Sequence, residues 1–393
     1  MGTQARGFSL VELMVAVVIG LLVLAAVTTV MVNSKKNYTV QDSLARLQEN
    51  ARFAVDFLTR DLRMSGHFGC AHGPLNATRN RLDIAGSPLF DANVGLAGLD
   101  NMVVGTSEWH SFSPPATDVD EDKKIVPGTD AIVMRFMNGD SIPVIAPFMT
   151  APTDPIMVAA NNGRLNQGDI VLVADCSTAD LFQVTSANPG VSGNVAHAAG
   201  VVGSPPIPPG NISDSFGDDP VKPKLYEGET ETVIIGFTIA RYFIGARDVK
   251  TGNICTADCA CDSNHICGLF RKIGADDAQE LVSGIESMQI LYGVDTDPTP
   301  PPPQLPDYAP NVYVSADTVT AVGGWGKVTS VRIGLLAYTL ASETESGEYG
   351  GVTDSGPYDV NGTAVSVTDG NLEAKRVKRR VFTTTVAVRN LRI

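Results

Sequence analysis

The hydrophobic pattern of the chain changes twice within the first 66 residues. Phe8 to Val32 is an apolar run of 25 residues, in which Glu12 is the single charged side chain. A helix of this length, at about 1.5 Å per residue, exceeds the ~30 Å hydrocarbon core of a bilayer. The run therefore predicts a transmembrane helix over residues 8–32, with a carboxylate close to its start.

The next segment, residues 33–66, has the period of an amphipathic helix. Its apolar positions lie three or four residues apart, which places them on one face. They are Val40, Leu44, Leu47, Ala51, Ala54, Leu58 and Leu62. Gly66 is a typical stop signal for a helix. The two segments predict one long helix, whose first half lies in lipid and whose second half packs on a globular body.

Residues 67–393 have the pattern of that body. Short apolar or alternating runs lie between turn signals at 131–136, 170–175, 180–184, 232–244, 268–273, 325–340 and 379–390. Residues 279–294 shift from helical to alternating spacing. Segment 204–210 has four prolines and predicts a linker or crossing loop, and the Pro-rich segment 298–310 predicts an exposed, semi-rigid loop. We expect an α+β fold with the long helix on a mainly antiparallel β-sheet.

Composition and charge fit this picture. Glycine and proline together supply 62 of 393 residues, which is typical of a body rich in loops and strands. The net charge is -14, and since Arg6 and Glu12 cancel, the residues after the apolar run account for all of it. An acidic body argues against nucleic acid as a partner, because nucleic-acid binders have a basic face. It also argues against docking on anionic lipid.

Six cysteines follow the apolar run, and none lies within it. They are Cys70, Cys176, Cys255, Cys259, Cys261 and Cys267. An even number beyond a membrane segment indicates an oxidising compartment and up to three disulfides, with 15 possible pairings. We expect Cys70 to pair with Cys176 and the other four to pair locally.

Two segments resemble metal-binding motifs, but the spacing of their residues does not match those motifs. The four local cysteines, with His265 among them, are separated by three, one and five residues, whereas structural zinc sites use C-x-x-C pairs. Two local disulfides are the better prediction. The acidic run 118–122 resembles a calcium loop, but Lys123 and Thr129 stand where an EF-hand needs glycine and glutamate. We interpret it as a solvated acidic loop and predict no metal or cofactor.

The apolar run predicts an anchor and not a cleaved secretory signal. It is too long for a signal peptide, and no A-x-A-like site follows Val32. Positive charges on its two sides are nearly equal, with Arg6 before it and Lys35 and Lys36 after it. The cysteines decide the orientation, because they place the body outside the cytoplasm.

The stretch Gly7-Phe8-Ser9-Leu10-Val11-Glu12 resembles the leader and mature start of type IV pilins and pseudopilins. The resemblance implies that residues 1–7 are a leader, that a prepilin peptidase cuts between Gly7 and Phe8, and that the new Phe8 amine is methylated. Glu12 becomes the fifth mature residue and meets the terminal amine of a neighbouring subunit. A bland alternative is that Glu12 lies near enough to the interface to reach water.

Further segments resemble the PilW-type minor pilins. These are Leu-Val-x-Gly-Ile-Glu followed by Tyr-Gly-Val-Asp within 279–295, Val-x-Ser-Val-Arg-Ile within 328–338, and Phe-Thr-Thr-Thr-Val-Ala-Val-Arg-Asn within 379–390. The resemblance implies a structural subunit that helps initiate a type IV pilus and caps it, with other minor pilins, the major pilin and a tip adhesin as partners. The body would lie in the periplasm, anchored in the inner membrane, and then at the fibre or its tip.

Two other functions remain open at this stage. One is a type II secretion pseudopilin, with the tip-like J subunit as the nearest kind, and the other is a tip module that binds DNA or a host ligand. No enzyme motif is present, and the five histidines lie outside any motif, so we expect no catalysis. The basic cluster of Lys375, Arg376, Lys378, Arg379 and Arg380 predicts a solvated strand end, or else a docking patch for another subunit.

Overall fold

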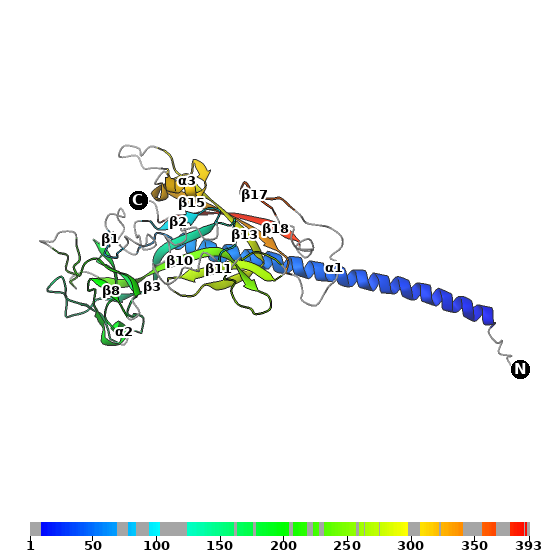
Figure 1. The fold of residues 1–393 in the computed structure, drawn as a ribbon, viewed down its shortest axis with the longest axis horizontal. Helices are drawn as coiled ribbons and strands as arrows, with labels where there is room; N and C mark the ends of the chain where they lie inside the picture. Colours follow the sequence, from blue (N-terminus) through cyan, green and yellow to red (C-terminus); the bar gives the residue numbers. More distant parts are fainter. Residues whose placement is uncertain are drawn as a thin grey trace.

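One long helix and two large, mainly antiparallel sheets form the framework of the protein (Figure 1). The computed structural model describes residues 9–68, 78–83, 94–102, 124–160, 163–175, 178–203, 207–217, 223–227, 232–256, 259–262, 264–274, 276–297, 307–321, 324–340, 356–366, 378–388 and 390. The predicted fold class is confirmed, since a long apolar N-terminal helix precedes a mainly antiparallel β-rich body.

Helix α1 runs without a break from Leu10 to Met64, a span of 55 residues. It ends where the sequence predicts, because Gly66 takes a positive φ of 75° that turns the chain away from the helix axis. The Gly66 N–H donates to the carbonyl of Arg135 in the body, at 2.8 Å. The end of the helix is thus fixed by both a local turn and a distant strand.

The first sheet is built around the 16-residue strand β10 (Val233–Asp248). Its path is β1 (Thr78–Asn80), β6 (Ala179–Gln183), β5 (Ile170–Ala174), β10, β11 (His265–Ile273) and β12 (Gln279–Ser283), and β3 (Ala131–Pro143) joins β10 to β2 (Leu96–Leu99). Because β10 is long and buried along most of its length, it pairs with three strands, β3, β5 and β11.

The second sheet has the order β14 (Val312–Val314), β13 (Ile285–Val294), β15 (Val328–Tyr338) and β18 (Arg379–Ala387). Around it lie α3 (Ala316–Ala321), a 3-10 helix (Trp325–Lys327) and the hairpin of β16 (Tyr358–Val360) and β17 (Thr363–Val365). The run 279–294, whose spacing starts as helical, forms two strands. Gly284, with a φ of 83°, divides it into β12 and β13, which belong to different sheets.

A smaller lobe lies at the end of the molecule opposite the N-terminus (Figure 1). We call it the distal lobe, meaning the described residues between 144 and 227. It contains β4 (Ile156–Met157), α2 (Pro189–Ser192), β7 (Asn194–Val195), β8 (Gly200–Val202) and β9 (Ile207–Asn211), besides β5 and β6. The predicted loop at 204–210 is wrong in part, because residues 207–211 form β9. A strand with one partner tolerates proline, and Gly210 provides a φ of 79°.

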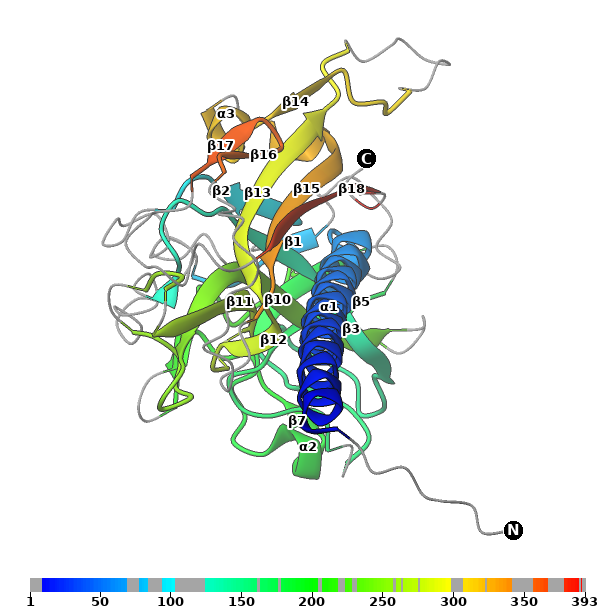
Figure 2. The same cartoon turned by 90° about the vertical axis from the view of Figure 1, so that its right-hand side faces the viewer.

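The second half of α1 packs into the body along its predicted apolar face. Leu47, Ala51, Ala54, Leu58 and Leu62 are buried in one cluster with side chains of both sheets, whereas Val40 and Leu44 are only half-buried. Viewed nearly end-on, α1 lies next to the strands β3 and β18, which it contacts (Figure 2). The helix therefore completes the main hydrophobic core.

A buried carboxylate joins the two sheets beside this core. Asp130, just before β3, accepts hydrogen bonds from the N–H of Ile290 on β13 at 2.7 Å and from the N–H of Asn101 at 2.9 Å. The Asp130 N–H in turn donates to the carbonyl of Met288 at 2.9 Å. Burial is the main cause that raises the pKa of Asp130 to about 7.

Replacing Leu58 with alanine should destabilise the fold, because Leu58 is fully buried between the helix and the sheets. We expect a loss of about 2–5 kcal/mol in the free energy of unfolding, from the lost burial and the cavity left behind. Denaturant unfolding of the full chain in detergent micelles measures it. The matched control is Phe53→Ala, which removes a side chain that is 51% exposed and should change stability by no more than about 0.5 kcal/mol. Equal effects of the two changes would contradict the packing described.

The raised pKa of Asp130 predicts a pH dependence. The folded state keeps a proton up to about pH 7, whereas the unfolded chain releases it near pH 4. Stability should therefore fall as pH rises between these values, by up to about 4 kcal/mol from this group, and then level off. Thermal unfolding of the wild type and of Asp130→Asn from pH 4 to pH 8 tests this. The difference between the two chains should change across that range, and a constant difference would exclude Asp130 as the source.

Candidate assembly site on the N-terminal helix

The first half of α1 has no partner in the described part of the chain. Every residue from Leu10 to Val32 is exposed, and this segment is long and apolar enough to cross a membrane. An apolar surface of this length is unfavourable in water, at roughly 25 cal/mol per Å². Lipid or other protein must therefore cover it.

Glu12 lies in the first turn of this segment. The backbone N–H of Ser9 donates to Glu12 Oε2 at 2.9 Å, so that the carboxylate caps the start of its own helix. The helix N-terminus also favours a negative charge at this place. Gly7 and Phe8, the predicted cleavage pair, lie outside the described residues, so the cut site stays a prediction.

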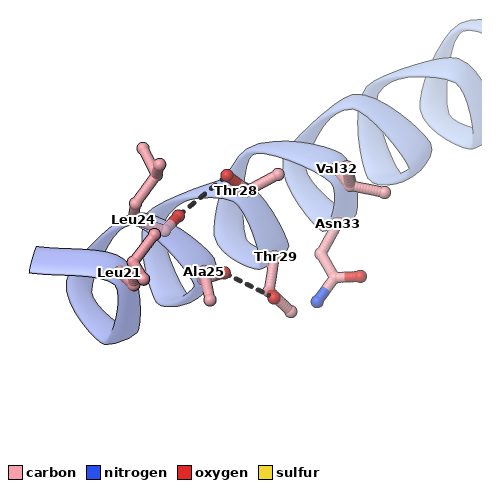
Figure 3. A pocket seen from close by; sticks show the side chains of 7 residues that line it. All are labelled: Leu21, Leu24, Ala25, Thr28, Thr29, Val32 and Asn33. Carbon is pink, nitrogen blue, oxygen red and sulfur yellow. Dashed lines mark hydrogen bonds between the residues drawn. The ribbon is translucent and has the colours of Figure 1, made fainter. Parts of the chain in front are cut away.

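Further along the same segment, apolar, small and polar residues line a shallow groove on the helix surface (Figure 3). It is lined by Leu21, Leu24, Ala25, Thr28, Thr29, Val32 and Asn33. The hydroxyls of Thr28 and Thr29 donate to the carbonyls of Leu24 and Ala25 at 2.8 and 2.9 Å. Because these hydroxyls are satisfied within the helix, the two threonines can enter lipid or contact another helix without leaving a hydroxyl donor unpaired.

The exposed segment is tied to the body by contacts that join the helix to distant parts of the chain. The Tyr242 hydroxyl on β10 donates to Asp61 Oδ2 at 2.6 Å, and burial, together with the Asp61 charge, raises the pKa of Tyr242 above its ordinary value. The Asn390 side-chain amide donates to the carbonyl of Arg63 at 2.9 Å, which satisfies a carbonyl of the last helical turn. Residues that are 181 and 327 positions apart thus hold the helix end. The sequence pattern contains no signal for such pairs.

Two disulfides close the loop between β10 and β11. Cys255 bonds to Cys259 and Cys261 bonds to Cys267, with Cα–Cα distances of 5.7 and 5.4 Å. The predicted local disulfides are confirmed, and the zinc alternative is wrong, because all four sulfurs are used. The His265 ring lies 2.9 Å from Asp262. Cys70 and Cys176, whose pairing we predict, lie outside the described residues.

The basic cluster near the C-terminus is only in part a solvated strand end. Arg379 is the exception, because its side chain is 3% exposed and its Nε lies 2.6 Å from Glu286 Oε2. This ion pair joins β18 to the start of β13, across the intervening strand β15. Arg380, the next residue, is exposed as predicted. Lys375 and Arg376 lie outside the described residues, as do the acidic run 118–122 and the prolines of 298–306.

Reducing agent and chelator should act differently on this protein. Reduction removes the crosslinks Cys255–Cys259 and Cys261–Cys267, and because both close short loops, each should cost about 2 kcal/mol in the free energy of unfolding. A chelator such as EDTA should leave stability unchanged, because no cysteine sulfur of this loop is free to bind a metal. Denaturant unfolding of the full chain in detergent with each reagent measures both effects. Destabilisation by EDTA, with no effect of the reductant, would contradict the assigned bonds.

Two family models match the chain, one at each end. The prokaryotic N-terminal methylation motif matches residues 3–28, which include the exposed apolar segment and Glu12. The type IV pilus-assembly protein W family matches residues 241–390, from the middle of β10 to the end of the described chain. No curated protein and no solved structure matches the chain. Both matches lie on one polypeptide, and together they support a PilW-type minor pilin of the type IV pilus, with an N-terminal helix long and apolar enough to anchor it in a membrane.

Proposed function

We propose that this chain helps to initiate assembly of a type IV pilus and caps the fibre together with other minor pilins. Its role would be structural and not enzymatic. One observation supports this best: the apolar half of α1 is fully exposed, while the other half of the same helix is part of the core of the body. Such a helix needs lipid around it before assembly and the helices of neighbouring subunits after it.

Glu12 would favour transfer of the helix from lipid into the assembled fibre. A carboxylate within a membrane segment costs at least about 2.5 kcal/mol, and a cation beside it offsets that cost. After cleavage between Gly7 and Phe8 by a prepilin peptidase, the methylated Phe8 amine of a neighbouring subunit would supply the cation. The acid would thus penalise the free subunit and favour the assembled one. Among the described residues, the Ser9 N–H is the one hydrogen-bond donor to the Glu12 carboxylate. The carboxylate can therefore accept a further hydrogen bond from a neighbouring subunit.

The body would lie in the periplasm before assembly and at the pilus tip afterwards. The two disulfides support an oxidising compartment for residues 255–267. The net charge of -14, which falls wholly after the apolar run, gives the body a solvated surface and little attraction to anionic lipid. The partners at the tip would be other minor pilins, the major pilin and a tip adhesin.

A type II secretion pseudopilin of the J kind is the second candidate, since pseudopilins have the same kind of N-terminus. The match of residues 241–390 to a pilus-assembly family favours the pilus. Deletion of the chain, followed by counting of surface pili and assay of secreted proteins, separates the two. Loss of pili supports our proposal, whereas unchanged piliation with lost secretion supports the pseudopilin.

Replacing Glu12 with alanine should leave membrane insertion intact and lower incorporation into pili by at least about tenfold, which corresponds to about 1.4 kcal/mol of lost preference for the fibre. Immunoblots of sheared pili and of membranes measure the two quantities in the deletion strain complemented with each variant. Glu49→Ala, an exposed acid on the second half of α1, is the matched control and should behave as wild type. Normal incorporation of Glu12→Ala would refute the role given to Glu12.

A further inference from the structure

The distal lobe contains one histidine, His197, in the segment between β7 and β8. Its side chain is buried, with 3% of the residue exposed, and the ring Nε2 lies 3.0 Å from the backbone carbonyl oxygen of Asp154. A carbonyl oxygen only accepts hydrogen bonds, so the proton of the neutral ring lies on Nε2. The neutral imidazole therefore joins the segment around His197 to the turn at residues 150–154.

The second ring nitrogen of His197, Nδ1, is buried and has no hydrogen-bond partner among the residues that the structure describes. The ring lies against aromatic side chains, with its centroid 4.2 Å from that of Phe216 and 5.7 Å from that of Phe182. A protonated imidazole has two N–H donors, and an N–H on Nδ1 would be buried here without an acceptor. The closed lobe therefore fits the neutral ring and not the charged one.

Three aspartates act on the ring, but they do not offset its burial. Burial is the largest influence and lowers the pKa of His197 below its ordinary value, whereas the hydrogen bond to Asp154 and the charges of Asp214 and Asp180 raise it by less. The Asp154 carboxylate is bound within its own turn, and Asp214 is exposed. Other charged or titratable groups on the neighbouring elements are bonded to one another, namely Arg79, Arg81 and Tyr226 to Asp180, and Lys224 to Asp175.

The segment around His197 closes a hydrophobic cluster of the lobe. Val195 on β7 pairs with Ile156 on β4, and both belong to this cluster together with Phe182 and Phe216. The cluster is separate from the main core, in which α1 is buried. The lobe also lies outside both matched family segments, at the end of the molecule opposite the N-terminus (Figure 1). Because regions with separate cores can open separately, this segment can open while the main core stays folded.

We propose that the distal lobe is a pH-sensitive element, which the neutral His197 ring keeps closed and which opens locally when that ring takes up a proton. In the opened segment the ring is in water and binds a proton near pH 6.5, as an ordinary histidine does. The contribution of this ring to the stability of the closed lobe is therefore complete above that pH and is lost as the pH falls below it. This inference goes beyond the proposed function and does not depend on it.

Hydrogen exchange of the full chain in detergent micelles, read by mass spectrometry from about pH 7.5 to about pH 5.5, tests this proposal. The reporters are peptides that contain the amides of Val158 and Thr185, which donate to the carbonyls of Gly193 and Ala196 at 2.8 Å each. After correction for the chemical exchange rate, the opened fraction should rise by up to about tenfold across this range, because an opened histidine gains most of its proton within it. Peptides from β13 and β15, in the main core, should show no such rise.

Two aspartates with raised pKa values cannot produce this result. Burial raises the pKa of Asp130 and of Asp169, so their protonation stabilises the fold as the pH falls. Their effect thus has the opposite sign to that of His197. A rise in exchange that is confined to the lobe would support the histidine, whereas an equal rise in β13 and β15 would indicate global unfolding and would overturn the proposal. A wild type without any rise would overturn it as well.

Variants of His197 give a second readout. His197→Phe removes the titrating group and keeps an aromatic ring beside Phe216, and His197→Gln keeps a donor for the Asp154 carbonyl. In both, the opened fraction of the lobe should be independent of pH, whatever its level at neutral pH. His265→Gln, at a half-buried histidine outside the lobe, is the matched control and should keep the rise. A rise that persists in either His197 variant would refute the role given to this ring, and if neither variant accumulates, the wild-type comparison of lobe and core decides the question by itself.

Discussion

Burial of one face of the second half of α1 is the interaction on which the rest of the structure depends. Leu47, Leu58 and Leu62 are buried in a core to which both sheets contribute. Ala51 and Ala54 have small side chains, so the helix can approach the sheets closely. The two sheets meet beside this helix, and Asp130 joins β3 to β13 there. Without the helix, the apolar sides of both sheets would face water, so helix and body form one hydrophobic unit.

The same helix has a second environment. From Leu10 to Val32 every side chain is exposed, and the described part of the body covers none of them. One continuous helix therefore connects an apolar segment, which is stable only in lipid or against other protein, to a water-soluble body. Contacts such as Tyr242 with Asp61 and Asn390 with Arg63 fix the helix at its far end. Whatever holds the apolar half also holds the body in a defined orientation.

The family-model matches include the membrane end of the molecule but not the distal lobe. The methylation motif covers the exposed apolar half of α1, and the PilW match covers the strands from the middle of β10 onward, several of which contribute to the main core. The distal lobe lies between these matched segments and far from the membrane end (Figure 1). The lobe joins the rest of the first sheet where β5 pairs with β10.

The sequence by itself determined the long helix, its membrane half, its buried face, most of the strands and the local disulfides, because each depends on spacing between near neighbours. Periods of two and of three to four residues are visible in a list of letters. Tertiary structure decided the rest. Only the fold divides 279–294 between two sheets at Gly284, buries Arg379 against Glu286, and turns the prolines of 207–211 into a strand. These outcomes depend on contacts with residues tens or hundreds of positions away, and the local sequence pattern does not predict such contacts.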